Sequence, residues 1–121
     1  MRPRSDTSAA TAVADLELRV ARGFFARARG LLGNPPPAEG CGLLIPRCVA
    51  IHTFGMRYAI DAVFIDHAGR VVALHAALPP WRVCRAANAS AVVEMAAGSA
   101  ARAGIRVGSE LSVARTALSE C

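Results

Sequence analysis

Two apolar runs joined by a short loop restrict the fold of this chain more than any other feature of its sequence. The runs cover residues 59–66 and 70–75, and the loop His67-Ala68-Gly69 separates them. Both runs are rich in β-branched residues and the loop glycine can supply a positive φ, so the pattern predicts an antiparallel hairpin. Because both runs are apolar on both faces, we expect this hairpin to lie in the centre of a sheet.

Further strands are predicted on either side of the hairpin. Residues 15–20 and 110–114 alternate apolar and polar side chains, which is typical of a strand with one buried face. Residues 40–51 are predicted to form a strand, a break at Pro46 and a second extended piece. Another strand is predicted over residues 91–95, so the chain is expected to contain five to seven short strands.

Two short helices are also predicted. Residues 22–33 place apolar and basic side chains on opposite sides of a helix, which Gly33 and the prolines after it end. Residues 98–104 have Ser99 as an N-cap and Gly104 beyond the C-terminus. Together these elements predict a mainly β fold, a single-domain β-sandwich or barrel-like antiparallel sheet with two short flanking helices.

The length of the chain fits one domain. It has 121 residues, of which 54% are hydrophobic, and a chain of this size can build a core without metal or disulfide support. We expect a disordered tail over residues 1–14 and one globular domain over residues 15–121. The longest stretch without Asp, Glu or Arg, Val71–Trp81, has eleven residues, whereas a membrane-spanning helix needs roughly 20. No membrane insertion is therefore expected.

The net charge of +5 is compatible with a phosphate-bearing partner, but its distribution is not typical of one. An acid-free basic stretch contains Arg19, Arg22, Arg27 and Arg29, and the remaining arginines are interspersed with Asp and Glu along the chain. Aromatic residues, which stack on bases, make up only 5% of the chain. We therefore do not expect nucleic-acid binding, and an anionic surface bound through Arg22, Arg27 and Arg29 stays an alternative.

The cysteines indicate the expected compartment. Their spacing is uneven and contains no C-x-x-C pair, which is not typical of a disulfide framework; they are Cys41, Cys48, Cys84 and Cys121. The N-terminal region has basic residues followed by small ones, but it lacks Leu, Ile and Phe and contains Asp6, so it does not match a signal peptide. We expect a cytoplasmic protein with reduced thiols.

Several segments, taken in order, resemble a known family. They are ARGLLG at 28–33, GLLI at 42–45, HTFGMR at 52–57, the hairpin residues 60–72, VEMAAG at 93–98 and GIRVG at 104–108. This order is similar to that of the bacterial and archaeal family called domain of unknown function 192, over about residues 16–115. The resemblance implies a compact, predominantly β domain of sandwich type with short flanking helices, and it implies no established activity.

The chain departs from the family at one motif. Family members commonly have Phe-Trp-Met-Lys followed by Asn-Thr and then Pro-Leu-Asp, whereas this chain has Phe54-Gly55-Met56-Arg57 and reaches Asp61 by a shorter route. It therefore lacks the Trp and the Asn-Thr pair. The resemblance also implies a genomic association, because relatives with the His-x-Phe-x-Met-Arg variant are often encoded near pilus or secretion machinery.

Asp61 is the most informative single residue. If Val63 and Ile65 face the core, the period of two places Asp61 on the same face, where a carboxylate needs a partner. Arg57 and Arg82 are the available cations, which would make an anion-recognising or acid/base site. The favoured alternative is structural: a buried ion pair, or a carboxylate that accepts hydrogen bonds from backbone N–H groups. Glu94, a lone carboxylate in a strand, is expected on a solvated face.

A second group of residues has thiol and imidazole chemistry. Cys41, Cys48 and His52, with Cys84 as a further member, could provide a nucleophile pair or zinc ligands. Their spacings match no compact zinc motif, and buried cysteines often act as small apolar residues, so packing in the core is favoured. No catalytic residue, metal ion or cofactor is predicted.

These observations favour a non-enzymatic binding or accessory domain that acts as a monomer. Its partner would be a protein or a small ligand, with the link to pilus or secretion machinery that the resemblance implies. The candidate binding surface consists of His52, Phe54, Met56, Arg57, Asp61, Trp81 and Arg82. The alternative function is a Cys/His metal-binding protein or thiol enzyme centred on Cys48 and His52.

Overall fold

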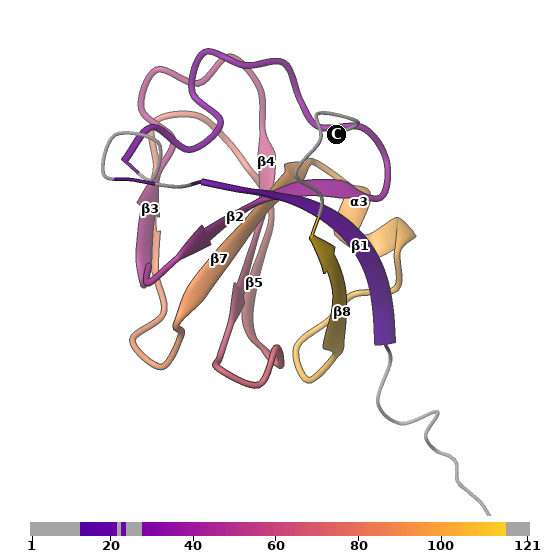
Figure 1. Ribbon diagram of the computed structural model, residues 1–121. Coiled ribbons are helices and arrows are strands. Elements are labelled where there is room, and N and C mark those ends of the chain that lie inside the picture. The colour runs from indigo at the N-terminus through magenta and orange to yellow at the C-terminus, as the bar shows by residue number, and fades with distance from the viewer. Residues whose placement is uncertain (1–12, 22, 24–27, 116–121) are drawn as a thin grey trace, which may run out of the picture.

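The computed structural model describes residues 13–21, 23 and 28–115 (Figure 1). Within these residues the chain forms eight strands and one short helix. In chain order they are β1 (Val13–Val20), β2 (Cys41–Pro46), β3 (Ala50–His52), β4 (Ile60–Ile65), β5 (Val71–Leu78), β6 (Val83–Arg85), β7 (Ala91–Ala96), α3 (Ser99–Arg102) and β8 (Glu110–Arg115). The predicted mainly β, single-domain fold is confirmed.

The strands form two sheets. A six-stranded sheet has the order β5-β4-β7-β2-β1-β8, and β3 pairs with β6 in a small second sheet. The large sheet is mixed rather than wholly antiparallel as predicted, because β1 runs parallel to both β2 and β8. Its two edge strands approach each other where Arg70 and Glu110 form an isolated bridge, but the sheet does not close into a barrel.

The predicted hairpin is confirmed as β4 and β5, which pair antiparallel. Its expected central position is correct only for β4, which lies between β5 and β7, whereas β5 is an edge strand. The difference has a physical cause: β4 is buried at every position, while most of β5 is half-buried or exposed. Residues such as Ala76 and Ala77 count as apolar in the sequence pattern, but their side chains are small enough to be exposed at the edge of a sheet.

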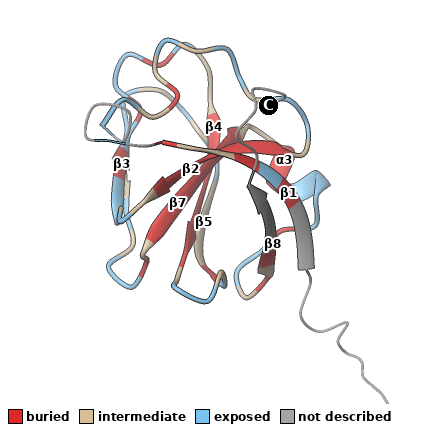
Figure 2. Cartoon of the chain, in the orientation of Figure 1, coloured by how far each residue is buried: buried red, intermediate tan, exposed pale blue. Residues whose placement is uncertain are grey.

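Both faces of the large sheet are covered, and Figure 2 shows β4 and β7 buried along most of their length. Along β4, Val63 and Ile65 face one core cluster, and Ala62 and Phe64 face the other. The first cluster also contains Leu16 and Leu18 of β1, whose alternation with an exposed Glu17 confirms the predicted one-sided burial.

The two predicted helices have different outcomes. The helix predicted over residues 22–33 lies partly outside the described residues, which omit positions 22 and 24–27; among the others, residues 23 and 28–29 are helical and residues 30–33 form turns. The second helix is present as α3, but its N-cap is Gly98 with φ 89°, not Ser99. The Ser99 side chain is buried and its Oγ has no hydrogen-bond partner. No helix among the described residues is long and apolar enough to cross a membrane.

Candidate functional site

A buried threonine joins the two segments that carry most of the predicted site. Thr53 follows β3, and its backbone N–H donates to the Arg82 carbonyl at 2.8 Å. The Thr53 Oγ1 hydroxyl donates to the Pro79 carbonyl at 2.7 Å and accepts from the Arg82 N–H at 2.9 Å. The Trp81 N–H donates to the Thr53 carbonyl at 3.1 Å. These bonds hold Trp81 at a φ of 67°, which an L-residue rarely adopts.

The threonine anchor places a row of rings on the outside of the small sheet. The ring centroids of His52 and Phe54 lie 5.2 Å apart, and Phe54 and Trp81 stack at 5.8 Å. Phe54 is 44% exposed, Trp81 65% and the neighbouring Val83 62%. We call these four residues the aromatic face. β3, which carries His52, lies on the opposite side of the molecule from β8 (Figure 1).

The surroundings of the aromatic face are basic. Residues 47–58 and 79–90, which form the small sheet and its flanking loops, contain four arginines and no Asp or Glu. Arg82 and Arg85 are both exposed beside Val83. Large apolar side chains exposed next to arginines are typical of an interaction surface.

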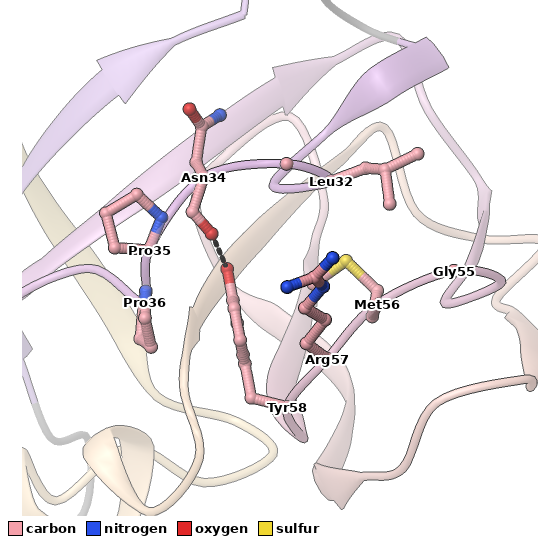
Figure 3. Close-up of a pocket in the computed structure, with 9 residues that line it drawn as sticks. Leu32, Asn34, Pro35, Pro36, Gly55, Met56, Arg57 and Tyr58 are labelled. Carbon is pink, nitrogen blue, oxygen red and sulfur yellow. Dashed lines mark hydrogen bonds between the residues drawn. The ribbon is translucent and has the colours of Figure 1, made fainter.

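Gly55 separates the aromatic face from a pocket. With a φ of 81° it reverses the chain between Phe54 and Met56, so Phe54 points to one side and Met56 and Arg57 line a cavity of about 620 Å³ on the other. The Leu32–Pro36 loop forms the opposite wall, and the Tyr58 hydroxyl donates to the Asn34 carbonyl at 2.7 Å (Figure 3). Met56 is buried and Arg57 is exposed.

Asp61 does not join this surface. It is completely buried in the core, on the same sheet face as Val63 and Ile65, as the sequence predicts. Its Oδ1 accepts from the Ala77 N–H at 2.8 Å, and its Oδ2 accepts from the Ala100 N–H at 2.9 Å. The structure therefore does not pair Asp61 with Arg57 or Arg82, and the carboxylate binds backbone N–H groups. It takes the place of a side-chain cap at α3.

Glu94 does not lie on a solvated face, as the sequence analysis expected. It is only 4% exposed, and it faces the core cluster on the opposite side of the sheet from Asp61. Burial raises the pKa of its carboxyl to about 7, and a hydrogen bond from the Leu31 N–H to Oε1 at 3.1 Å opposes that rise. A Cβ atom on Gly30 would lie 2.8 Å from Oε1. The sequence contains a signal for this burial: Glu94 is the one polar residue among the seven residues 91–97, and the other six are apolar.

The Cys48 and His52 side chains line a smaller cavity of about 200 Å³ together with Glu94. The Cys48 thiol donates to the Ala50 carbonyl at 3.0 Å, and His52 Nδ1 accepts from the Phe54 N–H at 3.1 Å. Among the described residues, no three His, Cys, Asp or Glu side chains are grouped so that they could hold a metal ion. Cys41 is disulfide-bonded, which differs from the expectation of reduced thiols.

The free thiols provide a direct check on the packing of the small sheet. Burial raises the pKa of the Cys84 thiol to about 11. The thiolate is the reactive form, so at pH 8 we expect iodoacetamide to modify Cys84 about 100-fold more slowly in the folded protein than in urea. Mass spectrometry of the alkylated chain measures this rate. Equal rates in the two states would contradict the half-buried position of Cys84.

Comparison with known proteins gives a family and two structural relatives. A model of the DUF192 family, described as "Uncharacterized ACR", matches residues 5–113. A protein of unknown function from Novosphingobium aromaticivorans is 26% identical, with a TM-score of 0.66 over 75% of this chain and 70% of that one. A candidate transcription regulator from Sinorhizobium meliloti is 22% identical, with a TM-score of 0.68 over 75% and 76%. No curated protein matches.

Proposed function

Because the chain belongs to the DUF192 family, which is described as uncharacterized, we propose a function from its surface: a non-enzymatic binding domain that recognises an acidic, apolar segment of a partner protein. The observation that carries this proposal is the exposed Phe54–Trp81 stack beside arginines. Trp, Tyr and Arg dominate the energetics of protein interfaces, so this is the composition expected at the centre of one.

The rigidity of the aromatic face supports the proposal. Thr53 makes hydrogen bonds to the Pro79–Arg82 segment through its N–H, its carbonyl and its hydroxyl. A side chain that is already held in position loses less conformational entropy when a partner binds. Trp81 also has a positive φ, a costly backbone conformation that persists only where the surrounding structure holds it.

The charge of the surface supports an acidic partner. Arg82 and Arg85 are exposed next to the apolar residues, and residues 47–58 and 79–90 contain no carboxylate that would neutralise them. Complementary charge across an interface accelerates association and excludes partners of the wrong sign. A segment that alternates Asp or Glu with large apolar residues could pair its carboxylates with the arginines and pack its apolar side chains against the aromatic face.

The resemblance guides the choice of partner. Components of pilus or secretion machinery are the first proteins to test, because relatives with the same motif are often encoded near them.

The cytoplasmic location stays a prediction from the sequence. The disulfide at Cys41 counts against it, because disulfide bonds are rare in cytosolic proteins.

A peptide selection tests the proposal without knowledge of the partner. Random twelve-residue peptides displayed on phage are selected on the immobilised protein, and we expect the retained sequences to combine acidic and large apolar residues. The affinity of one selected peptide is then measured by fluorescence anisotropy. We expect Trp81→Ala and Phe54→Ala each to weaken binding at least tenfold, the loss typical of an interface hot spot.

Matched variants separate the contribution of the aromatic rings to peptide binding from that of the arginines. Val107 is 62% exposed, like Val83, but lies outside the aromatic face, so Val107→Ala should leave the affinity unchanged. Replacing Arg82 and Arg85 by Gln should reduce the dependence of binding on salt. Selected peptides without acidic residues, or an affinity unaffected by Trp81→Ala, would refute the proposal. Tighter binding of single-stranded DNA than of peptide at this face would assign the surface to nucleic acid instead.

A further inference from the structure

We propose that the pocket between the Leu32–Pro36 loop and the Gly55–Tyr58 loop is a binding site for a small apolar molecule that carries one carboxylate. This site is separate from the aromatic face and does not depend on the function proposed for it. The cavity of about 620 Å³ lies within the range of about 300–1,000 Å³ that is usual for small-molecule sites.

The walls of the pocket are held in place before any ligand binds. The Tyr58 hydroxyl donates to the Asn34 carbonyl at 2.7 Å and so ties one loop to the other. The Leu32–Pro36 loop turns at Gly33, which has a φ of 84°, and continues into three consecutive prolines that restrict its backbone. A preformed cavity avoids the entropy cost of ordering loops around a ligand.

The chemistry of the lining selects the class of ligand. Four apolar side chains line the cavity, namely Leu32, Pro35, Pro36 and Met56, and no acidic residue is among the lining residues. Arg57 is the single charged lining residue. Figure 3 shows Arg57 and Met56 on one side of the Tyr58 ring and Pro35 and Pro36 on the other.

The Arg57 guanidinium is available for a ligand. It is exposed at the cavity, and none of the hydrogen bonds or ion pairs among the described residues involves its side chain. Guanidinium binds carboxylate through two parallel N–H···O bonds, which an amide of the same shape cannot reproduce at full strength. One cation beside apolar walls suits a monoanion, because a dianion would retain an uncompensated charge.

Tyr58 does not oppose an anion in this pocket. Burial, and to a lesser extent the nearby charge of Glu94, raise the pKa of its phenol above the usual value, so the ring stays neutral at physiological pH. Glu94 itself is buried beneath the Leu31 backbone and does not line the cavity. Arg57, the single charged residue in the lining, therefore makes the electrostatic potential in the pocket positive.

The test uses a panel of defined probes on the full-length protein. Straight-chain carboxylates of four to twelve carbons and phenyl-terminated carboxylates are each compared with their neutral primary amide by isothermal titration calorimetry. We expect at least one carboxylate to bind, and its amide to bind at least tenfold more weakly. Arg57→Gln should lower the affinity for that carboxylate to the level of the amide. Arg106→Gln, at an exposed arginine outside both the pocket and the aromatic face, should leave it unchanged.

The outcomes separate this proposal from the first one. Trp81→Ala removes the aromatic face but no part of the pocket lining, so it should abolish peptide binding and preserve carboxylate binding. If no member of the panel binds, if an amide binds as tightly as its acid, or if Arg57→Gln has no effect, the pocket is not a carboxylate site. None of these results would bear on the outcome of the peptide experiment.

Discussion

Asp61→Ala should lower the free energy of unfolding by about 2–4 kcal/mol, because it leaves two backbone N–H groups without their acceptor. Losing the hydrogen bond from the Ala100 N–H should cost more than losing the other one. This N–H lies in the buried N-terminus of α3, where no other side chain can replace the carboxylate. The Ala77 N–H lies at a part-buried site near the end of β5. Urea unfolding followed by circular dichroism measures the change.

A milder variant and a double-mutant cycle test the cause. Asp61→Asn keeps one acceptor oxygen and should cost about 1–2 kcal/mol. Arg57→Ala alone should be close to neutral, because Arg57 is exposed, and its effect should add to that of Asp61→Ala within about 0.5 kcal/mol. A coupling above about 1 kcal/mol between Arg57 and Asp61 would indicate an ion pair and contradict the geometry described above.

Glu94→Gln should stabilise the protein above pH 7 by about 1–3 kcal/mol and have almost no effect near pH 4.5. The folded-state pKa of about 7 lies above the ordinary value of 4.5, so between these two values the folded state binds more protons than the unfolded state. The parent protein therefore loses stability as pH rises from about 4.5 to 7 and keeps that loss at higher pH.

The size of this effect follows from the difference between the two pKa values. At about 1.4 kcal/mol per pH unit, the rise from 4.5 to about 7 corresponds to roughly 3 kcal/mol of lost stability. Gln keeps an oxygen that accepts from the Leu31 N–H but leaves a buried amide donor, which offsets part of the gain. Urea unfolding at pH 4.5, 6 and 8 measures it. Glu39→Gln, at an exposed residue, serves as control, and a parallel pH profile for Glu94→Gln and the parent would contradict the assignment.

Local patterns predict most of the strands, because burial on a sheet has a period of two, but they miss the short β6, so that eight strands are present among the described residues where five to seven were expected. The alternation in β1 and the hairpin of β4 and β5 are present as expected. Edge and centre could not be distinguished, because β5 uses short apolar residues that are compatible with either position. The parallel pairing of β1 with β2 and β8 is a long-range property that no local pattern contains.

The sequence draws attention to residues of the candidate site but does not contain their arrangement. It marks the motif from His52 to Arg57 as a unit, whereas the turn at Gly55 divides this motif between the aromatic face and the pocket. The proximity of Phe54 and Trp81 depends on the buried hydroxyl of Thr53, which carries no recognisable signal in the sequence. Ser99 looked like a helix cap, yet a carboxylate distant in the sequence, Asp61, has that role.

If the aromatic face is the recognition surface, chemical-shift mapping will locate a bound peptide on it. The ¹⁵N-labelled protein is titrated with a peptide from the phage selection, and amide shifts are followed residue by residue. We expect the largest shifts to fall within residues 47–58 and 79–90 and to include the indole N–H of Trp81. Largest shifts elsewhere, such as over residues 104–111 on the far side of the sheet, would contradict it.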